Sequence, residues 1–411
     1  MLELLFPRAH VRYASLPILG NTLDGLCVWL DALGYPAGAI KRRIRAAALL
    51  ARALRRHDVR SLGEMTASEL RSYAPPPRWY NSPPQGALVR SLIQYLEERG
   101  ELAPTPLTPT ELRVIDYRQY LECVRGLSAS TIEVHGATIT KFLRFLDHDV
   151  RPRQLHDLRG AEVQAFLTHA GQHVSRGRMV QVTAILRSFL RFLAAAGEGP
   201  VGLDAQIESP RIYRGARLPR ALPWDAVRAL LKSIDRTTPK GRRDFAMFLL
   251  IATYGLRASE VAALELDDIA WRTRQIRVPR PKVDTPLLLP LTDEVGSAIF
   301  DYLRRGRSAS TDRHLFLRVE APLGPLGRGA VGDAFRAWAR CAGTPPCGPH
   351  CLRHALALRL LREGASLKAI GDLLGHRSAE STGVYLRLDV DDLRDVALPL
   401  PATPMAEEAR P

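Results

Sequence analysis

The stretch HCLRHALALRLLREGASLKAIGDLLGHRSAESTGVY, residues 350–385, joins a helical repeat of leucines to polar groups that packing alone does not require. His350 and Arg353 are three residues apart, so on a helix both side chains lie on one face. His376 follows a glycine, and Tyr385 comes nine residues later. The segment around Tyr385 is too polar for a core, so its simplest interpretation is an amphipathic ring on a surface helix.

A second arginine follows a buried helix. The stretch RDFAMFLLIATYG, residues 243–255, is largely apolar and ends at a glycine, which is typical of a helix terminus. Arg257 comes two residues after it, and Glu260 three residues after that. Taken alone, these two residues predict a surface ion pair. His350 alone could be a satisfied core histidine, and Arg353 alone a helix-surface cation.

A lysine lies in the next segment. The stretch QIRVPRPKVDTPLLLPL, residues 275–291, predicts a β-hairpin with its turn near Val283 and Asp284. Lys282 precedes that turn. Its ordinary explanation is a solvated lysine at the tip of a hairpin.

Cysteine and histidine alternate at the start of the quoted stretch, at Cys347, His350, Cys351 and His354. This alternation suggests a zinc site. The spacing, however, would place all four side chains in one row on a single helix, and such a row cannot surround a tetrahedral ion. We therefore expect no metal site here.

The composition points to a polyanionic partner. The chain has 411 residues, with 58 Lys and Arg against 43 Asp and Glu, and a formal net charge of +15. Nucleic acid is the leading candidate, because phosphate contacts dominate such binding. Five scattered cysteines predict no disulfide framework, no apolar run reaches the roughly 18 residues that span a bilayer, and the first residues, MLELLF, are too short for a signal peptide. We expect a cytoplasmic protein.

Proline-rich breaks divide the chain. They occur at residues 74–84, 100–111 and 197–223. The pieces between them have ordinary helical spacing, except for the mixed final piece. We expect the following organisation: a helical N-terminal module at 1–105, a helical domain at 107–196, an interdomain linker at 197–221, a mixed domain at 222–395 and a Pro-rich tail at 396–411.

A faint internal repeat links the first two pieces. Residues 34–70 can be aligned with residues 126–163, which pairs Ile40 with Ile132, Leu54 with Leu146 and Glu69 with Glu162. A second copy of one helical unit would explain these matches, but amphipathic helices resemble one another without common origin. The sequence leaves both interpretations open.

The motifs together resemble those of the tyrosine recombinase (phage integrase) family. The resemblance covers roughly residues 107–395 and is strongest over 350–385, where His-x-x-Arg, Leu-Gly-His and a tyrosine follow in the family's order and spacing. TYGLRASEVAALELDDI, residues 253–269, is similar to the family's first arginine motif. The hairpin departs from the family pattern, because PRPKVDTP stands where a glycine-flanked lysine is usual.

The resemblance implies a mainly α fold: a helical, SAM-like core-binding domain and a mostly helical catalytic domain with a small antiparallel sheet, closing on DNA as a C-shaped clamp. It also implies the site residues. Tyr385 would be the nucleophile that forms a 3′-phosphotyrosine, and two guanidiniums would hold the scissile phosphate. The remaining groups would move protons or donate hydrogen bonds. The implied site is Arg257 and Arg353 as phosphate clamps, His350 as acid/base partner, His376 as hydrogen-bond donor, Lys282 as general acid and Tyr385.

The expected function is site-specific recombination as an integrase, transposon recombinase or resolvase, without metal or other cofactor. The expected partner is double-stranded DNA with paired half-sites, bound by a dimer on one site and a tetramer in the synapse, with accessory recombinases or DNA-bending proteins as further candidates. The segment after Tyr385, residues 386–401, is expected to contact a neighbouring subunit. The alternatives are a type IB topoisomerase-like enzyme and a non-catalytic DNA-binding protein on the same scaffold. We expect residues 1–105 to form an additional DNA-binding or assembly arm.

Overall fold

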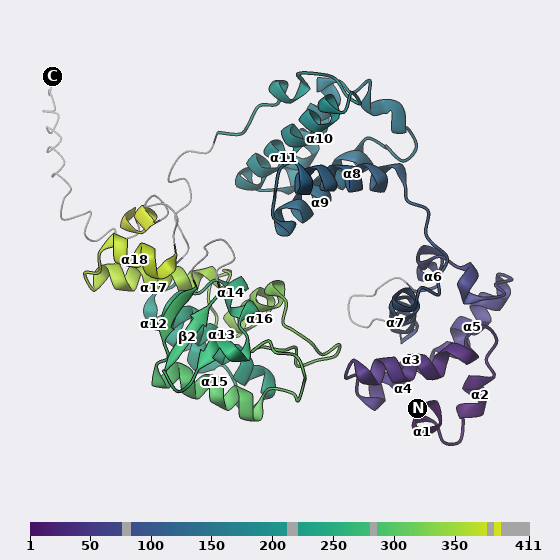
Figure 1. Cartoon of the computed structure of the whole chain (residues 1–411), viewed down its shortest axis with the longest axis horizontal. Coiled ribbons are helices and arrows are strands. Elements are labelled where there is room, and N and C mark those ends of the chain that lie inside the picture. The colour runs from purple at the N-terminus through teal and green to yellow at the C-terminus, as the bar shows by residue number, and fades with distance from the viewer. Residues whose placement is uncertain (76–83, 212–220, 280–285, 376–381, 388–411) are drawn as a thin grey trace, which may run out of the picture. The chain divides into compact units, whose positions relative to one another are not determined.

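Figure 1 shows the computed structural model of the chain, which describes residues 1–75, 84–211, 221–279, 286–375 and 382–387. Within these residues the secondary structure is mostly helical, with one small antiparallel sheet. This confirms the expected fold class. Among the described helices, none combines the length and the apolar character needed to cross a lipid bilayer.

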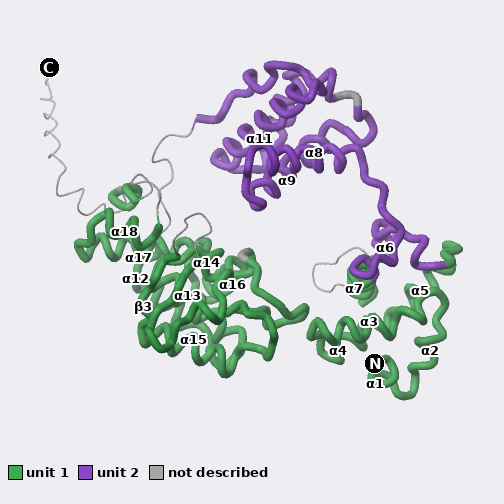
Figure 2. The backbone as a smooth tube through the Cα atoms, in the orientation of Figure 1, with its two compact units in different colours: residues 1–60, 73–95, 217–411 green, residues 61–72, 96–216 purple. Residues whose placement is uncertain are grey.

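Backbone contacts group the chain into two compact units (Figure 2). One unit contains residues 1–60, 73–95 and 217–411, and the other contains residues 61–72 and 96–216. The helices are described below in chain order, and each contact that is mentioned lies within one unit.

The first hundred residues form short helices whose apolar faces are buried. Leu23, Leu26 and Leu30 on one helix and Ile40 and Ile44 on the next are fully buried, at the spacing of a helix face. The elements are α1 (Leu2–Leu5), α2 (His10–Ala14), α3 (Gly20–Ala32), α4 (Ala37–Arg45), α5 (Ala47–Arg56), the 3-10 helix η1 (Leu62–Glu64), α6 (Ala67–Ser72) and α7 (Pro84–Arg99).

The middle of the chain is helical throughout, as predicted. Thr108 begins the first helix by accepting a hydrogen bond from the backbone of Glu111, whose carboxylate accepts one from the Thr108 N–H in return. Tyr117, Phe142 and Phe189 are fully buried in a separate core. The elements are α8 (Pro109–Cys123), α9 (Ala129–Phe145), η2 (Pro152–Leu155), α10 (Gly160–His173), α11 (Arg176–Ala195) and η3 (Leu203–Gln206).

The last part of the chain is built around α13 (Pro239–Tyr254), which is buried along most of its length and largely apolar from Phe245 onward. A buried ion pair within this helix also accepts a hydrogen bond from a tryptophan of α16. Arg243 donates to Asp244 Oδ1 at 2.7 Å and 2.9 Å, and Trp338 Nε1 donates to Asp244 Oδ2 at 2.9 Å. The helices are α12 (Trp224–Ser233), α13 (Pro239–Tyr254), α14 (Ala258–Ala263), η4 (Leu266–Asp268), α15 (Asp293–Arg305), α16 (Arg328–Cys341), α17 (His350–Arg362), α18 (Leu367–Leu374) and η5 (Val384–Arg387).

The small sheet contains the predicted hairpin. Strand β2 (Gln275–Val278) pairs antiparallel with β3 (Leu287–Pro290), and β1 (Ile269–Ala270) pairs with the other edge of β2. Ile276, Val278 and Leu289 point into the core formed with α13. The strands of the hairpin are confirmed, whereas its predicted turn lies outside the described residues.

Candidate active site

The site is organised where α13 ends against α17 and α18. Gly255 ends α13 with φ 65°, a backbone conformation that glycine adopts without strain. A Cβ at this position would lie 2.4 Å from Leu374 Cδ2 and 3.3 Å from Leu356 Cδ2. The glycine therefore allows both the turn and the close approach of the three helices.

Arg353 is buried at this junction. It lies on α17, its exposed fraction is 4%, and it donates from Nη1 to the Gly255 carbonyl and from Nη2 to the Leu374 carbonyl. Carbonyl oxygens orient a guanidinium but do not neutralise its full charge. The interpretation of Arg353 as a helix-surface cation is therefore wrong. It is a buried cation held in a defined orientation.

Arg257 reaches the same turn from the other side. The expected ion pair is confirmed, since Arg257 Nη1 donates to Glu260 Oε1 at 2.7 Å and the Arg257 N–H donates to Glu260 Oε2 at 2.7 Å. Arg257 Nη2 also donates to the carbonyl of Gly375 at 3.1 Å. Because Leu374 and Gly375 are consecutive, the two arginines converge on one turn at the end of α18. The Arg257 side chain remains 37% exposed, whereas Glu260 is buried.

His350 is the first residue of α17, one turn before Arg353. His350 is exposed, yet desolvation by the surrounding protein and the positive charges of Arg353 and Arg257 lower its pKa, and Glu260 opposes them. His350 therefore lies near enough to both arginines for their charges to act on its ring. A histidine with a lowered pKa is neutral at pH 7 and can accept a proton.

Tyr385 is buried next to this cluster. It lies in η5 with an exposed fraction of 1%, packed with Ala357, Ile370 and Leu374. Its hydroxyl is 2.9 Å from Nδ1 of His354. Burial raises the pKa of Tyr385, and the charge of Arg353 acts in the opposite direction. The interpretation of Tyr385 as a ring on a surface helix is wrong, because this ring belongs to a small core.

His354 is the residue that sequence reasoning missed. It entered only as a zinc ligand that was then rejected. The available signal was its position, since it directly follows Arg353 and lies one turn after His350 on the same helix. Lys282 and His376 lie outside the described residues. The described neighbours are β2 and β3 on either side of Lys282, and Gly375 immediately before His376.

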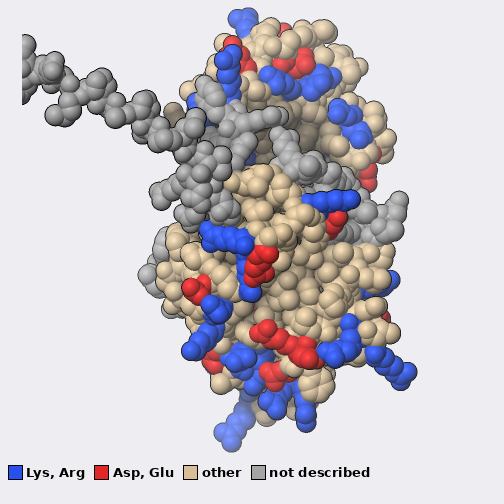
Figure 3. Space-filling view, turned by 90° about the vertical axis from the view of Figure 1, so that its left-hand side faces the viewer, with Lys and Arg blue, Asp and Glu red and all other residues tan. Residues whose placement is uncertain are grey.

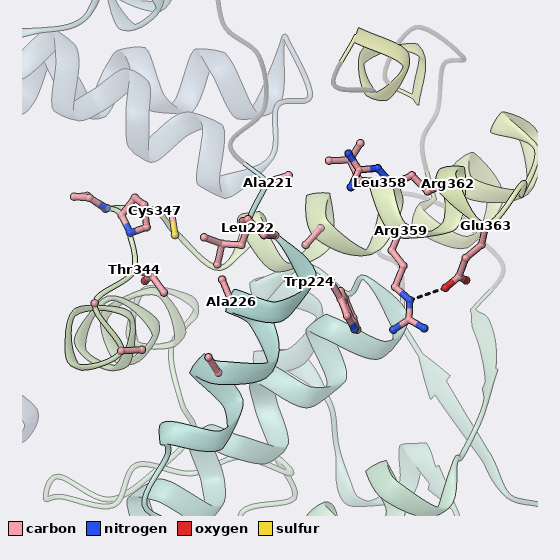
Figure 4. Close-up of a pocket in the computed structure, with 17 residues that line it drawn as sticks. Ala221, Leu222, Trp224, Ala226, Thr344, Cys347, Leu358, Arg359, Arg362 and Glu363 are labelled. Atoms are coloured by element: carbon pink, nitrogen blue, oxygen red, sulfur yellow. Dashed lines mark hydrogen bonds and ion pairs between the residues drawn. The ribbon is translucent and has the colours of Figure 1, made fainter. Parts of the chain in front are cut away.

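A separate hollow of about 900 Å³ is lined by residues of α12, such as Trp224 and Ala226, and of α17, such as Arg359 (Figure 4). Trp224 forms part of its wall, and Arg359 lies over that ring, 4.6 Å from its centroid, while bonding Glu363 at 2.7 Å. None of the predicted site residues that the structure describes lines this hollow. The convergent arginines, rather than this hollow, therefore define the candidate site.

Metal ligation finds no support among the residues that the structure describes, because no group of three or more His, Cys, Asp or Glu side chains could hold an ion. The expectation that Cys347, His350, Cys351 and His354 all lie on one helix is wrong for the first of them. Cys347 lies before α17, with its Sγ 3.1 Å from Sγ of Cys351. Both cysteines are free thiols.

Comparisons with known proteins point in one direction. A family model described as "Phage integrase family" matches residues 220–391, and one described as "Phage integrase, N-terminal SAM-like domain" matches residues 114–197. The putative integrase/recombinase y4rA of Sinorhizobium fredii (strain NBRC 101917 / NGR234) is 38% identical over 326 residues, covering 77% of this chain and 78% of that protein. The tyrosine recombinase XerD of Listeria monocytogenes serotype 4b (strain F2365) is 31% identical over 287 residues, covering 68% of this chain and 95% of XerD.

Two solved structures share the fold. The XerH site-specific recombinase, in a post-cleavage complex with a palindromic difH substrate, gives a TM-score of 0.55 at 16% identity, covering 71% of this chain and 97% of that one. A lambda integrase tetramer bound to a Holliday junction gives a TM-score of 0.51 at 16% identity, covering 74% of this chain and 87% of that one.

Proposed function

Because this chain belongs to the phage integrase family of tyrosine recombinases, we propose that it cleaves and rejoins duplex DNA at specific sites through a 3′-phosphotyrosine intermediate. The observation that carries the proposal is the convergence of Arg257 and Arg353 on the turn after α18. We place this activity in the cytoplasm.

The two guanidiniums suit a phosphoryl transfer. Attack on a phosphodiester spreads negative charge over the non-bridging oxygens, and a planar guanidinium can hydrogen-bond two such oxygens at once. Glu260 orients Arg257, and backbone carbonyls orient Arg353, so each guanidinium already has a fixed direction. A guanidinium keeps its charge throughout such a reaction, so it can act as a fixed cation.

Tyr385 and His350 supply the covalent step. The Tyr385 oxygen forms a bond to phosphorus, and the bond from phosphorus to the 5′ oxygen breaks. The phenolic proton goes to a neutral acceptor, a role that the lowered pKa of His350 suits. The 5′ oxygen leaves with a proton from a general acid. We assign that acid to Lys282, and a hydrogen bond to the phosphate to His376.

The position of Tyr385 adds a condition to this mechanism. Tyr385 is 1% exposed and Arg353 4% exposed, and the Tyr385 hydroxyl lies 2.9 Å from His354 Nδ1, so neither side chain can contact a phosphate of duplex DNA in this arrangement. Cleavage therefore requires η5 to leave its place against Ala357 and Leu374. We propose that this arrangement is a resting state in which the nucleophile is stored.

Strand exchange needs several active sites, since one tyrosine cuts one strand. Solved structures with the same fold include a lambda integrase dimer on a core site and a tetramer on a Holliday junction. We propose the same assemblies for this chain, with residues 107–196 and 222–395 closing on one half-site. The segment at 386–401, proposed to reach a neighbouring subunit, lies mostly outside the described residues.

A plasmid assay tests the function. Two copies of the DNA that flanks the gene, cloned on one plasmid, should yield recombinant circles with the wild-type protein, and EDTA should not prevent their formation. Relaxed plasmid without any recombinant product would indicate a topoisomerase-like enzyme instead. DNA binding without either product would indicate a non-catalytic protein.

A further inference from the structure

Four arginines line a hollow in the N-terminal part of the chain, outside the residues that either family model matches. Arg12 comes from α2, and Arg52, Arg55 and Arg56 come from α5. The hollow has a volume of about 460 Å³, and its remaining walls are small or apolar: Leu16, Pro17, Ala48 and Ala51. No carboxylate lines it. We call this depression the arginine groove.

The four guanidiniums have no internal partner among the residues that the structure describes. All four side chains are exposed, and none makes an ion pair or donates a hydrogen bond there. The local sequence explains why, since residues 32–57 contain seven Lys and Arg and no Asp or Glu. Asp24, a nearby acid in sequence, is bound to the N-terminal amine at 3.2 Å.

Three exposed arginines of the catalytic part are paired with acids. Arg228 pairs with Asp225 at 2.6 Å, Arg305 pairs with Asp301 at 3.5 Å, and Arg336 pairs with Asp333. On the face of the molecule that Figure 3 shows, acidic side chains lie among the lysines and arginines. The arginine groove differs from these pairs because it groups four arginines around one hollow whose described lining contains no carboxylate.

The arginines of α4 and α5 are also divided by role. Arg43 stabilises the fold, because its guanidinium lies over the Tyr35 ring at 4.3 Å and its Nε donates to Ser91 Oγ at 3.2 Å. Arg52, Arg55 and Arg56 have no such contacts. Side chains that serve neither the core nor an ion pair are available for an external anion.

The element order gives independent support. When α4 and α5 are counted as one interrupted helix, the run from α3 to α7 has the same order as the run from α8 to α11. Each run has two helices, a 3-10 helix (η1 or η2) and two more helices. Only Ala46 separates α4 from α5. The aligned glutamates also act alike. Glu69 Oε2 accepts from the Thr66 N–H at 2.8 Å, and Glu162 Oε2 accepts from the Arg159 N–H at 2.9 Å, each at the start of a third helix.

We propose that the arginine groove binds the phosphates of duplex DNA, and that the N-terminal helices are a second, sequence-independent DNA-binding unit of this recombinase. The inference rests on the proposed function only in taking DNA as the polyanion. Contacts to phosphate position a protein on DNA without reading bases, and each neutralised phosphate releases counterions. The groove would add binding sites beyond the half-site that the other two domains hold.

The test measures the salt dependence of binding by the full chain to a duplex that extends well beyond the recombination site. Replacing Arg52, Arg55 and Arg56 with Gln should reduce the slope of log K against log salt by about 0.9 for each arginine that contacts a phosphate. The Lys versions of the same three positions should retain most of the slope. A matched control, R228Q/R305Q/R336Q, loses the same formal charge from paired arginines and should change the slope much less.

Two outcomes would overturn the proposal: an unchanged slope in the Gln variant, or an equal loss in the matched control, which would make net charge the cause. Modification of the wild-type protein with phenylglyoxal, read by mass spectrometry, tests it without any substitution. Duplex DNA should protect Arg52, Arg55 and Arg56. Protection by inorganic phosphate alone, with none by DNA, would reduce the groove to a small-anion site and contradict the proposal.

Failure of the groove proposal and failure of the proposed recombinase function would give different results. At saturating protein, the yield of covalent complex on a short substrate should be the same for wild type and for the Gln variant. Absence of covalent complex with the wild-type protein would count against the recombinase mechanism and leave the salt and protection results to decide the groove.

Discussion

Two groups of arginines in this molecule make opposite use of the same side chain. Arg257 and Arg353 are held by Glu260 and by the carbonyls of Gly255, Leu374 and Gly375, so that each guanidinium has a fixed direction. The arginines of the groove project from α2 and α5 with no partner in the described structure. The difference teaches that the protein fixes the direction of a guanidinium where a reaction needs exact geometry. Where only positive charge is needed, the guanidinium is left without a fixed direction.

Lysine substitutions should separate the two groups most strongly. A lysine keeps the charge of an arginine but loses its planar pair of donors. R353K or R257K should slow formation of the covalent complex by about 100- to 1000-fold, the usual consequence of losing one donor to a developing oxyanion. Lysine at 52, 55 and 56 should leave that rate unchanged. Single-turnover cleavage of a nicked suicide substrate measures both.

The comparison would break if all the lysine variants behaved alike. Melting temperatures provide the control, because a variant that has lost cleavage through unfolding melts early. Unimpaired cleavage by folded R353K would mean that charge alone suffices at the active site.

Gly255 tests the packing that directs Arg353. G255A should destabilise the protein by about 2 to 4 kcal/mol, since alanine is strained at φ 65° and its Cβ would meet Leu374 Cδ2. Gly343 is a matched control, with φ 67° and nothing within 4 Å of an added Cβ. G343A should therefore show the backbone strain alone, about 1 to 2 kcal/mol. Urea unfolding of both variants measures the difference, and equal losses would contradict the close packing of α13 against α18.

The smallest expected effect is on pH dependence. The folded-state pKa of His350 is lowered, so the unfolded chain binds more protons than the folded chain as pH falls below the ordinary histidine value. His350 therefore subtracts stability at acidic pH and contributes nothing above neutrality. His350→Gln should lessen the fall of the melting temperature between pH 7 and pH 5, and an unchanged or steeper fall would contradict the electrostatic proximity to Arg353 and Arg257.

Much of this architecture could be predicted from local sequence. Helical spacing predicted a helical domain at 107–196, where α8 to α11 lie, the glycine after Tyr254 marked the end of α13, and residues 275–291 predicted the hairpin of β2 and β3. The arginine motifs could be predicted because phosphate chemistry restricts which residue types can serve, and because their order along the chain is specific to one family.

The surroundings of these residues could not be predicted in the same way. The polar sequence around Tyr385 suggested a surface ring, but burial depends on which helices meet there, and Ala357, Ile370 and Leu374 come from two other elements. The hydrogen bond between Tyr385 and His354 spans thirty-one residues and leaves no periodic signal. The groove likewise depends on α2 approaching α5, which composition alone does not reveal.

The most direct test of the central claim is a covalent trap on a suicide substrate nicked near the cleavage point, compared between wild type, Tyr385→Phe and Tyr302→Phe. Tyr302 is equally buried, with a hydroxyl that accepts from the Leu317 N–H at 3.1 Å, and serves as the matched loss of a phenolic oxygen. The account predicts a DNA-linked peptide containing Tyr385 in wild type and in Tyr302→Phe, and none in Tyr385→Phe, whose DNA affinity should stay within a few-fold of wild type. A covalent complex that persists in Tyr385→Phe would show that another residue attacks the phosphate.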